Sequence, residues 1–187
     1  MATCSKLATG VTFNCPPPAA GVEAGEIVLF NWDDISRSGS TLTNTQLQTI
    51  VAVTPPLLGY KFEGINNSVR PSYESVADGF NPFKFNHTLE FRVFDDGGTI
   101  SDLEEDLAGS KLVAVYFTKS EYVKVLGWNV GLRATVVRNY YEEDGAALVT
   151  LTTPADEFEP KPALTYVGSA SPIADYETLK AEIIALT

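Results

Sequence analysis

The most regular alternation of hydrophobic and polar residues in this chain lies between Phe83 and Val93. The apolar parity holds Phe83, Phe85, Leu89, Phe91 and Val93, while lysine, asparagine, threonine, glutamate and arginine hold the other. Successive side chains of a strand point to opposite faces, so this pattern predicts a strand with one buried face and one solvent-exposed face. His87 falls on the apolar parity. We expect it to be a hydrogen-bonded core residue, not a base or a metal ligand.

A denser run of strands is predicted from Lys111 to Thr153. Its segments read KLVAVYF, YVKVLGW, GLRATVVRNYY and AALVTLTT, separated by short polar or glycine turns. At the centre, Gly127 and Gly131 are expected to make a tight turn, and Trp128 between them is expected to anchor the core. The alternative for Trp128 is a stacking platform for a sugar, shared with Tyr140 and Tyr141.

The rest of the chain predicts shorter elements. Strands are expected at Glu26 to Trp32, Leu47 to Val53 and Leu58 to Ile65. Three stretches are expected to be loops: the polar SRSGSTLTNT, the segment Ser68 to Pro82 with its prolines and glycine, and the acidic, proline-broken Pro154 to Pro162.

Two helices are predicted by their capping signals. Ser101 and Glu104 have the spacing of a capping box, which predicts a helix from about Asp102 to Ala108. A second helix is expected from about Ile173 to Leu186, with Ser171 as its cap and Pro172 in its first turn. Its apolar stripe, which we expect to pack on the sheet or on a neighbouring subunit, consists of Tyr176, Leu179, Ile183 and Leu186.

These elements predict a mainly β protein, an antiparallel β-sandwich or barrel with a short internal helix and a C-terminal helix. At 187 residues the chain fits one domain. We divide it into an extended N-terminal arm (1–25), rich in proline and glycine, a β-sandwich domain (26–170) and the C-terminal helix (171–187), packed on the domain or on a neighbour.

The net charge of the chain limits the kinds of partner that we expect it to bind. The formal net charge is −11, and the segment 139–187 alone, with nine acidic residues against two lysines, contributes −7 of it. Sequence-independent nucleic-acid binding depends on cationic contacts to phosphate, so that role is not expected. The N-terminus lacks the apolar run of a signal peptide and no segment has the length of a membrane helix, so we expect a chain made in a cytoplasm, without a membrane partner.

The sequence contains few signs of a catalytic or metal-binding site. Cys4 and Cys15 do not supply a zinc site, and they are expected to be two reduced thiols or a disulfide formed in a particle outside a cell. No G-x-S-x-G, phosphate-binding loop, dinucleotide fingerprint or H-E-x-x-H is present. The run Glu104-Glu105-Asp106 is explained by helix capping and solvation, not by a metal. We therefore expect a protein that is not an enzyme and has no catalytic residues, metal or cofactor.

The expected function comes from a resemblance of several segments of the chain to a known class of proteins. The N-terminal arrangement of Cys4, Leu7-Ala8-Thr9-Gly10, Cys15, a glycine at Gly21 or Gly25, and EIVLFNWDDI is similar to virion structural proteins of tailed bacteriophages, particularly those infecting Bacteroidetes. Three later segments continue the similarity: Asn67-Ser68 before FKFNHTLEFRV, then ISDLEEDLAGSKLVAVYF, then VLGWNVGL to LVTLTT. Pro16-Pro17-Pro18 departs from it, because the relatives tend to be charged and then Gly-Gly there.

The resemblance implies a non-enzymatic protein of the virion, assembled in the cytoplasm of the host bacterium. It would contact copies of itself and other virion proteins through sheet edges and arms. The first position it implies is the tail tube, where an acidic lumen would let DNA pass without binding; the second is an auxiliary (decoration) protein of the capsid. A carbohydrate-binding β-sandwich module is the alternative from another class.

Overall fold

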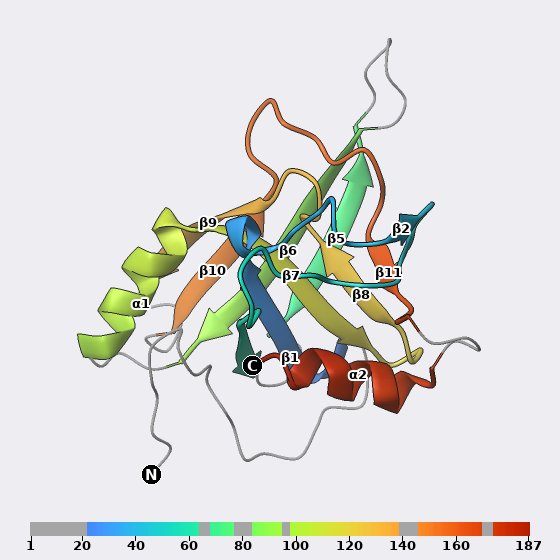
Figure 1. The fold of residues 1–187 in the computed structure, drawn as a ribbon. Coiled ribbons are helices and arrows are strands. Elements are labelled where there is room, and N and C mark those ends of the chain that lie inside the picture. Colours follow the sequence, from blue (N-terminus) through green and yellow to red (C-terminus); the bar gives the residue numbers. More distant parts are fainter. Residues whose placement is uncertain (1–21, 64–67, 77–83, 95–97, 139–145, 170–173) are drawn as a thin grey trace.

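The computed structural model describes residues 22–63, 68–76, 84–94, 98–138, 146–169 and 174–187. The fold is mainly β, as predicted, and is consistent with a β-sandwich-like arrangement (Figure 1). Its strands are β1 Val22–Asn31, β2 Leu42–Thr43, β3 Gln46–Leu47, β4 Gly59–Glu63, β5 Arg70–Ser75, β6 Phe85–Val93, β7 Lys111–Thr118, β8 Val123–Leu126, β9 Leu132–Arg138, β10 Ala147–Thr152 and β11 Leu164–Tyr166. The helices in the described ranges are α1 Gly98–Gly109 and α2 Tyr176–Ile184, with a 3-10 turn at Trp32–Asp34.

All the strands join one hydrogen-bonded sheet that folds over itself. Its order is β2-β3-β11-β8-β7-β9-β10-β6-β5, and β1 pairs with both β4 and β7. β7 is the pivot, because β1 lies on one of its sides while β8 and β9 share the other. The pairs are antiparallel except β3 with β11, a parallel pair that makes the sheet mixed.

Two hydrophobic clusters lie on opposite faces of β1 and β7. The first holds Ile27 and Leu29 of β1 against Phe91 of β6 and Val149 of β10, between the two layers of the folded sheet. The second holds the alternate residues of the same strands, such as Val28, under α2. A strand covered on both faces is apolar at every position. This accounts for the uninterrupted buried run Leu112 to Phe117 in β7.

Helix α1 covers one end of the sandwich beside β9. Leu103 and Leu107 are buried in the first cluster, and Glu104 accepts a hydrogen bond from Arg138 Nε of β9 (3.0 Å). The helix already runs at Gly98, so Ser101 lies inside it and the predicted capping box is wrong. Packing of the two leucines on β9 fixes the helix, and tertiary contacts of this kind override a local capping signal.

Helix α2, by contrast, is shorter than predicted. It starts at Tyr176, and the Asp175 carboxylate caps it by accepting from Thr178 N (2.9 Å); the predicted cap Ser171 and Pro172 lie outside the described residues. The exposed aspartate gains this backbone hydrogen bond, which holds its pKa below the usual value. Leu179 and Ile183 are buried in the second cluster, so in the single chain the predicted stripe faces the sheet.

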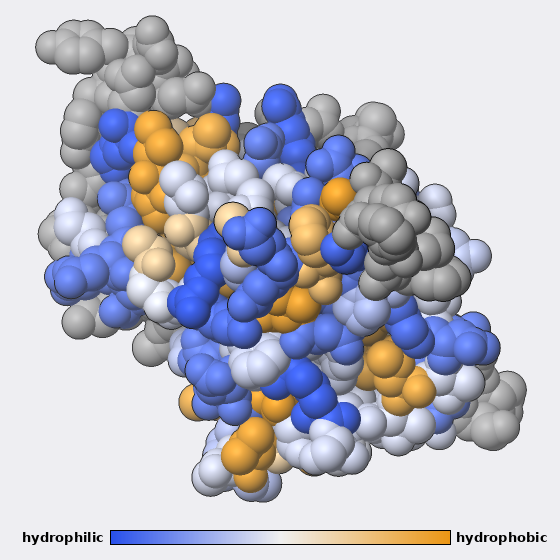
Figure 2. Space-filling model, turned by 90° about the horizontal axis from the view of Figure 1, so that it is seen from above, coloured by the Kyte–Doolittle hydropathy of each residue, from blue (hydrophilic) through white to orange (hydrophobic). Residues whose placement is uncertain are grey.

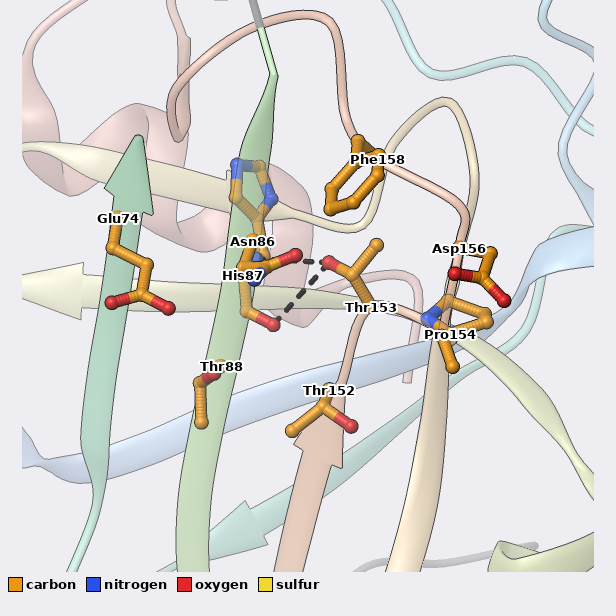
Figure 3. Close-up of a pocket in the computed structure, with 10 residues that line it drawn as sticks. Glu74, Asn86, His87, Thr88, Thr152, Thr153, Pro154, Asp156 and Phe158 are labelled. Atoms are coloured by element: carbon orange, nitrogen blue, oxygen red, sulfur yellow. Dashed lines mark hydrogen bonds between the residues drawn. The ribbon is translucent and has the colours of Figure 1, made fainter. Parts of the chain in front are cut away.

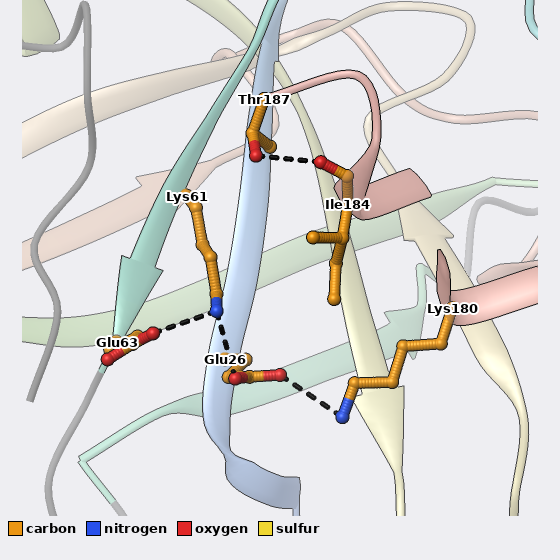
Figure 4. Close-up of polar contacts among 6 residues, drawn as sticks. All are labelled: Glu26, Lys61, Glu63, Lys180, Ile184 and Thr187. Atoms are coloured by element: carbon orange, nitrogen blue, oxygen red, sulfur yellow. Dashed lines mark hydrogen bonds and ion pairs between the residues drawn. The ribbon is translucent and has the colours of Figure 1, made fainter. Parts of the chain in front are cut away.

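An ion-pair network joins α2 to the edge of the sheet (Figure 4). Lys61 of β4 reaches Glu63 (2.8 Å) and Glu26 of β1 (3.0 Å), and Glu26 also meets Lys180 of α2 (3.1 Å). Burial raises the pKa of Glu26, but hydrogen bonds from Lys61 and Lys180 outweigh it and leave the pKa lowered.

Other differences from the predicted elements concern short strands. The strand expected at Leu47 to Val53 reduces to Gln46–Leu47; beyond it, Ser36 N bonds to Val51 O (2.7 Å) in an irregular contact. The polar loop contains β2, and the segment Ser68 to Pro82 contains β5 with Pro71 inside it. Proline is tolerated on an edge strand, which is where β5 lies.

Candidate functional site

The turn between β8 and β9 has a backbone that only glycine suits at two places. Gly127 and Gly131 have φ of 70° and 83°. A Cβ on Gly127 would lie 2.5 Å from Leu132 Cγ, and one on Gly131 would lie 2.7 Å from atoms of Lys111 and Trp32. Between the glycines Trp128 is only 3% exposed. Its ring belongs to the second cluster and presents no free face to a sugar.

The side chain of Glu159 binds the backbone of this turn. Its carboxylate accepts hydrogen bonds from Asn129 N (3.0 and 3.1 Å), Asn129 Nδ2 (2.8 Å) and Val130 N (2.8 Å). The residue is 1% exposed. A buried carboxylate requires such donors to offset its desolvation. Sequence reasoning missed Glu159, because the segment Pro154 to Pro162 was predicted to be a surface excursion.

Arg37 holds the same turn from another side. Its Nε donates to Trp128 O (2.9 Å) and its terminal nitrogens donate to Trp32 O (2.7 Å) and Ile35 O (3.0 Å). Its guanidinium lies 3.5 Å from the centre of the Trp32 ring, a cation–π contact. Burial lowers the pKa of Arg37, and the charges of Asp33 and Glu159 oppose that shift. In the sequence, Arg37 is recognisable only as an arginine within a polar loop, which does not indicate these contacts.

His87 supplies a third contact to the turn. Gly127 N donates to His87 Nδ1 (3.1 Å), so Nε2 carries the proton and donates to Lys161 O (3.0 Å). The side chain is 1% exposed, and burial lowers its pKa although Glu159 acts in the opposite direction. His87 is therefore the hydrogen-bonded core residue that the alternation predicted. Both ring nitrogens are occupied, so neither is available to a substrate or metal as the site stands.

A polar hollow of about 270 Å³ lies beside His87 on the outer face of β5, β6 and the end of β10 (Figure 3). Its lining includes Asn86, Thr88, Thr152 and the ring of Phe158. The carboxylates of Glu74 and Asp156 lie on opposite sides of it and do not converge (Figure 3). A glycosidase-like site would need two carboxylates facing one bond, so this hollow does not provide that arrangement.

A second, wider hollow of about 550 Å³ lies where β1, α1, β7 and β9 meet. Lys111 and Arg133, opposite each other in the β7–β9 register, face it together with Asp33 and Asp34. Lys111 Nζ also lies 3.9 Å from the centre of the Trp32 ring. Charges of both signs therefore line this hollow.

The described part of the chain contains no group of three His, Cys, Asp or Glu residues placed to hold a metal ion. Glu104 of the acidic run is instead paired with Arg138. No helix within the described ranges has the length and apolarity needed to cross a membrane. Cys4 and Cys15, and the Tyr140 and Tyr141 of the suggested stacking platform, lie outside the described residues.

Comparison with known proteins adds no relative. No protein-family model, no curated protein and no solved structure matched the chain. The site therefore defines a class only by its geometry: a β-sandwich-like protein in which the buried His87 and Glu159 and the partly buried Arg37 bind the backbone of one turn.

Proposed function

We propose that this chain is a non-enzymatic structural protein of a tailed-bacteriophage virion that assembles with copies of itself through the edges of its sheet. The tail tube is the first position proposed. Two lines support the class: the resemblance in residues from Cys4 to Thr153, and the edge strand β5, which has no further strand beside it within the described part of the chain. The open edge at β5 is the observation that carries the proposal.

The hydrogen bonds of β6 show which backbone N–H and C=O groups of β5 point away from β6. Phe85 exchanges bonds with Glu159 (2.9 and 3.0 Å) and the His87 carbonyl accepts from Thr153 N (3.0 Å), all on the side away from β5. Alternate residues of an antiparallel strand bond to opposite neighbours. Tyr73 and Ser75, which lie opposite His87 and Phe85, therefore direct their N–H and C=O groups outward. Open strand edges are templates for pairing with another chain.

The contacts of the buried polar residues also favour a structural role. His87, Arg37 and Glu159 converge on the backbone of one turn from three separate segments. Groups held in this way position the chain and do not meet a reactant in the hollow. On the one face shown, apolar residues gather in separate groups among hydrophilic ones (Figure 2), which suits contacts made by edges and polar surfaces.

Negative-stain electron microscopy of the purified chain tests the proposal. Rings or stacked tubes support the tail tube, and the acidic charge would then be expected to line the lumen, where it repels DNA. A chain that forms no rings but decorates purified capsids supports the auxiliary capsid protein, which is the second candidate. A chain that does neither, and that is missing from purified virions by mass spectrometry, overturns both.

A further inference from the structure

The open edge of β5 carries charges of opposite sign at a fixed spacing. Arg70 and Glu74 are both exposed and, four residues apart on a strand, lie on the same face. Neither forms an ion pair within the described part of the chain. On the other face, Tyr73 is 52% exposed although its edge approaches the buried His87 ring (6.2 Å between centroids).

We propose that β5 pairs antiparallel with β5 of a second copy, about a two-fold axis that passes beside Ser72. This pairing places Arg70 opposite the partner's Glu74, and Glu74 opposite the partner's Arg70. Opposite charges directly across two strands are stabilising, and like charges are destabilising. The inference rests on the proposed function only in requiring that copies of the chain contact one another.

Other antiparallel registers lose these contacts. If Pro71 faces the partner's Pro71, neither residue can donate a hydrogen bond at an outward position. If Glu74 faces the partner's Glu74, two like charges meet. If Tyr73 faces its own copy, Arg70 lies opposite Val76 and has no charge partner directly across. In the register centred on Ser72, the Tyr73 N–H of each copy meets the Pro71 carbonyl of the other.

The contact is closed, because each copy uses the same patch on the other. It therefore ends at two copies and does not by itself generate a ring. A tail-tube ring would need a further contact in which two different surfaces of the chain meet. In the pair the exposed Tyr73 ring would lie across from the partner's Pro71, so apolar surface would be covered on one face while ion pairs form on the other.

Sedimentation equilibrium of the full chain tests the charge pairing. The wild type is expected to dimerise, and Arg70→Glu or Glu74→Arg should weaken the dimer by about tenfold or more, because two attractions become repulsions. The double variant Arg70→Glu/Glu74→Arg should restore it, since the exchanged charges pair again. Arg133→Glu, an equal charge change on β9, is the control and should leave the dimer unchanged. A monomeric wild type, or a dimer that survives Arg70→Glu, overturns the contact.

A disulfide tests the register. Ser72 would face the partner's Ser72 as a non-hydrogen-bonded pair, with Cα atoms about 4.5 Å apart, a separation that a disulfide can span. In a Cys4→Ser/Cys15→Ser background, Ser72→Cys should therefore form a covalent dimer on mild oxidation, whereas Ser75→Cys should not. A covalent dimer from Ser75→Cys, or none from Ser72→Cys, overturns this register. If the wild type forms rings or decorates capsids but fails these dimer and disulfide tests, the proposed function stands while the β5 contact fails.

Discussion

Removing the carboxylate of Glu159 gives the sharpest test of how the β8–β9 turn is held. Glu159→Ala would leave Asn129 N, Asn129 Nδ2 and Val130 N without their acceptor. An unsatisfied buried donor costs about 1–3 kcal/mol. Because Asn129 and Val130 are only half-buried, water can reach part of the turn, and we expect a loss at the lower end of the sum for three donors, about 3–5 kcal/mol.

The loss is measurable by urea unfolding. Trp128 and Trp32 are close to the turn and provide a fluorescence signal. A domain of this size has a free energy of unfolding of about 5–15 kcal/mol, so Glu159→Ala should lower the midpoint visibly. Glu159→Gln keeps the size of the side chain but puts a donor where an acceptor stood, and it should lose about 1–3 kcal/mol.

Glu157→Ala is the matched control, because Glu157 is exposed two residues away. It should change the free energy of unfolding by no more than about 0.5 kcal/mol. If Glu159→Ala unfolds within about 1 kcal/mol of the wild type, the carboxylate does not hold the turn and the reasoning is refuted.

Three further predictions concern separate parts of the fold. Gly131→Ala should cost about 1–3 kcal/mol in thermal unfolding, because φ is positive and the new Cβ would meet Trp32; an unchanged melting temperature would contradict this. The lowered pKa of His87 means that the unfolded chain binds the proton more readily. Its stabilisation is present above about pH 6.5 and is lost as the pH falls below that value. Subtracting the curve of unfolding free energy against pH for His87→Gln from that of the wild type should isolate the part of the acid-side slope that His87 contributes. Identical slopes in the two proteins would contradict this prediction. Asp175→Ala should lower the melting temperature through loss of the α2 cap, while Asp175→Asn should retain most of the cap's stabilisation; equal losses in the two variants would point to charge instead.

The sequence predicted the elements whose burial repeats along the chain. β6 was readable because one face is buried, and β7 because both faces are. Strands of two or three residues, such as β2, β3 and β11, are too short to show a period. β5 was hidden by Pro71 and by its exposed side chains, because an edge strand with little buried surface gives no hydrophobic signal.

The core of the site was predicted only in part. Gly127, Trp128 and Gly131 were recognisable as a turn, and His87 as a buried residue, from their own neighbourhoods. Glu159 was not, because an acidic residue between prolines is typical of a surface loop, and its donors lie 29 and 30 residues earlier in the chain. Arg37 was missed for the same reason: nothing near it in sequence indicates the carbonyl that it binds.

The three contacts that hold the β8–β9 turn have a consequence for the order of folding. The turn links β8 and β9, which follow each other along one edge of β7 and do not pair with each other, so no local hairpin holds it. Its backbone is instead held by residues 30, 40 and 91 positions away along the chain. Contacts between residues distant in sequence form after the intervening chain has been ordered and slow the search for the native state. We therefore expect this turn to be among the last parts of the molecule to become rigid.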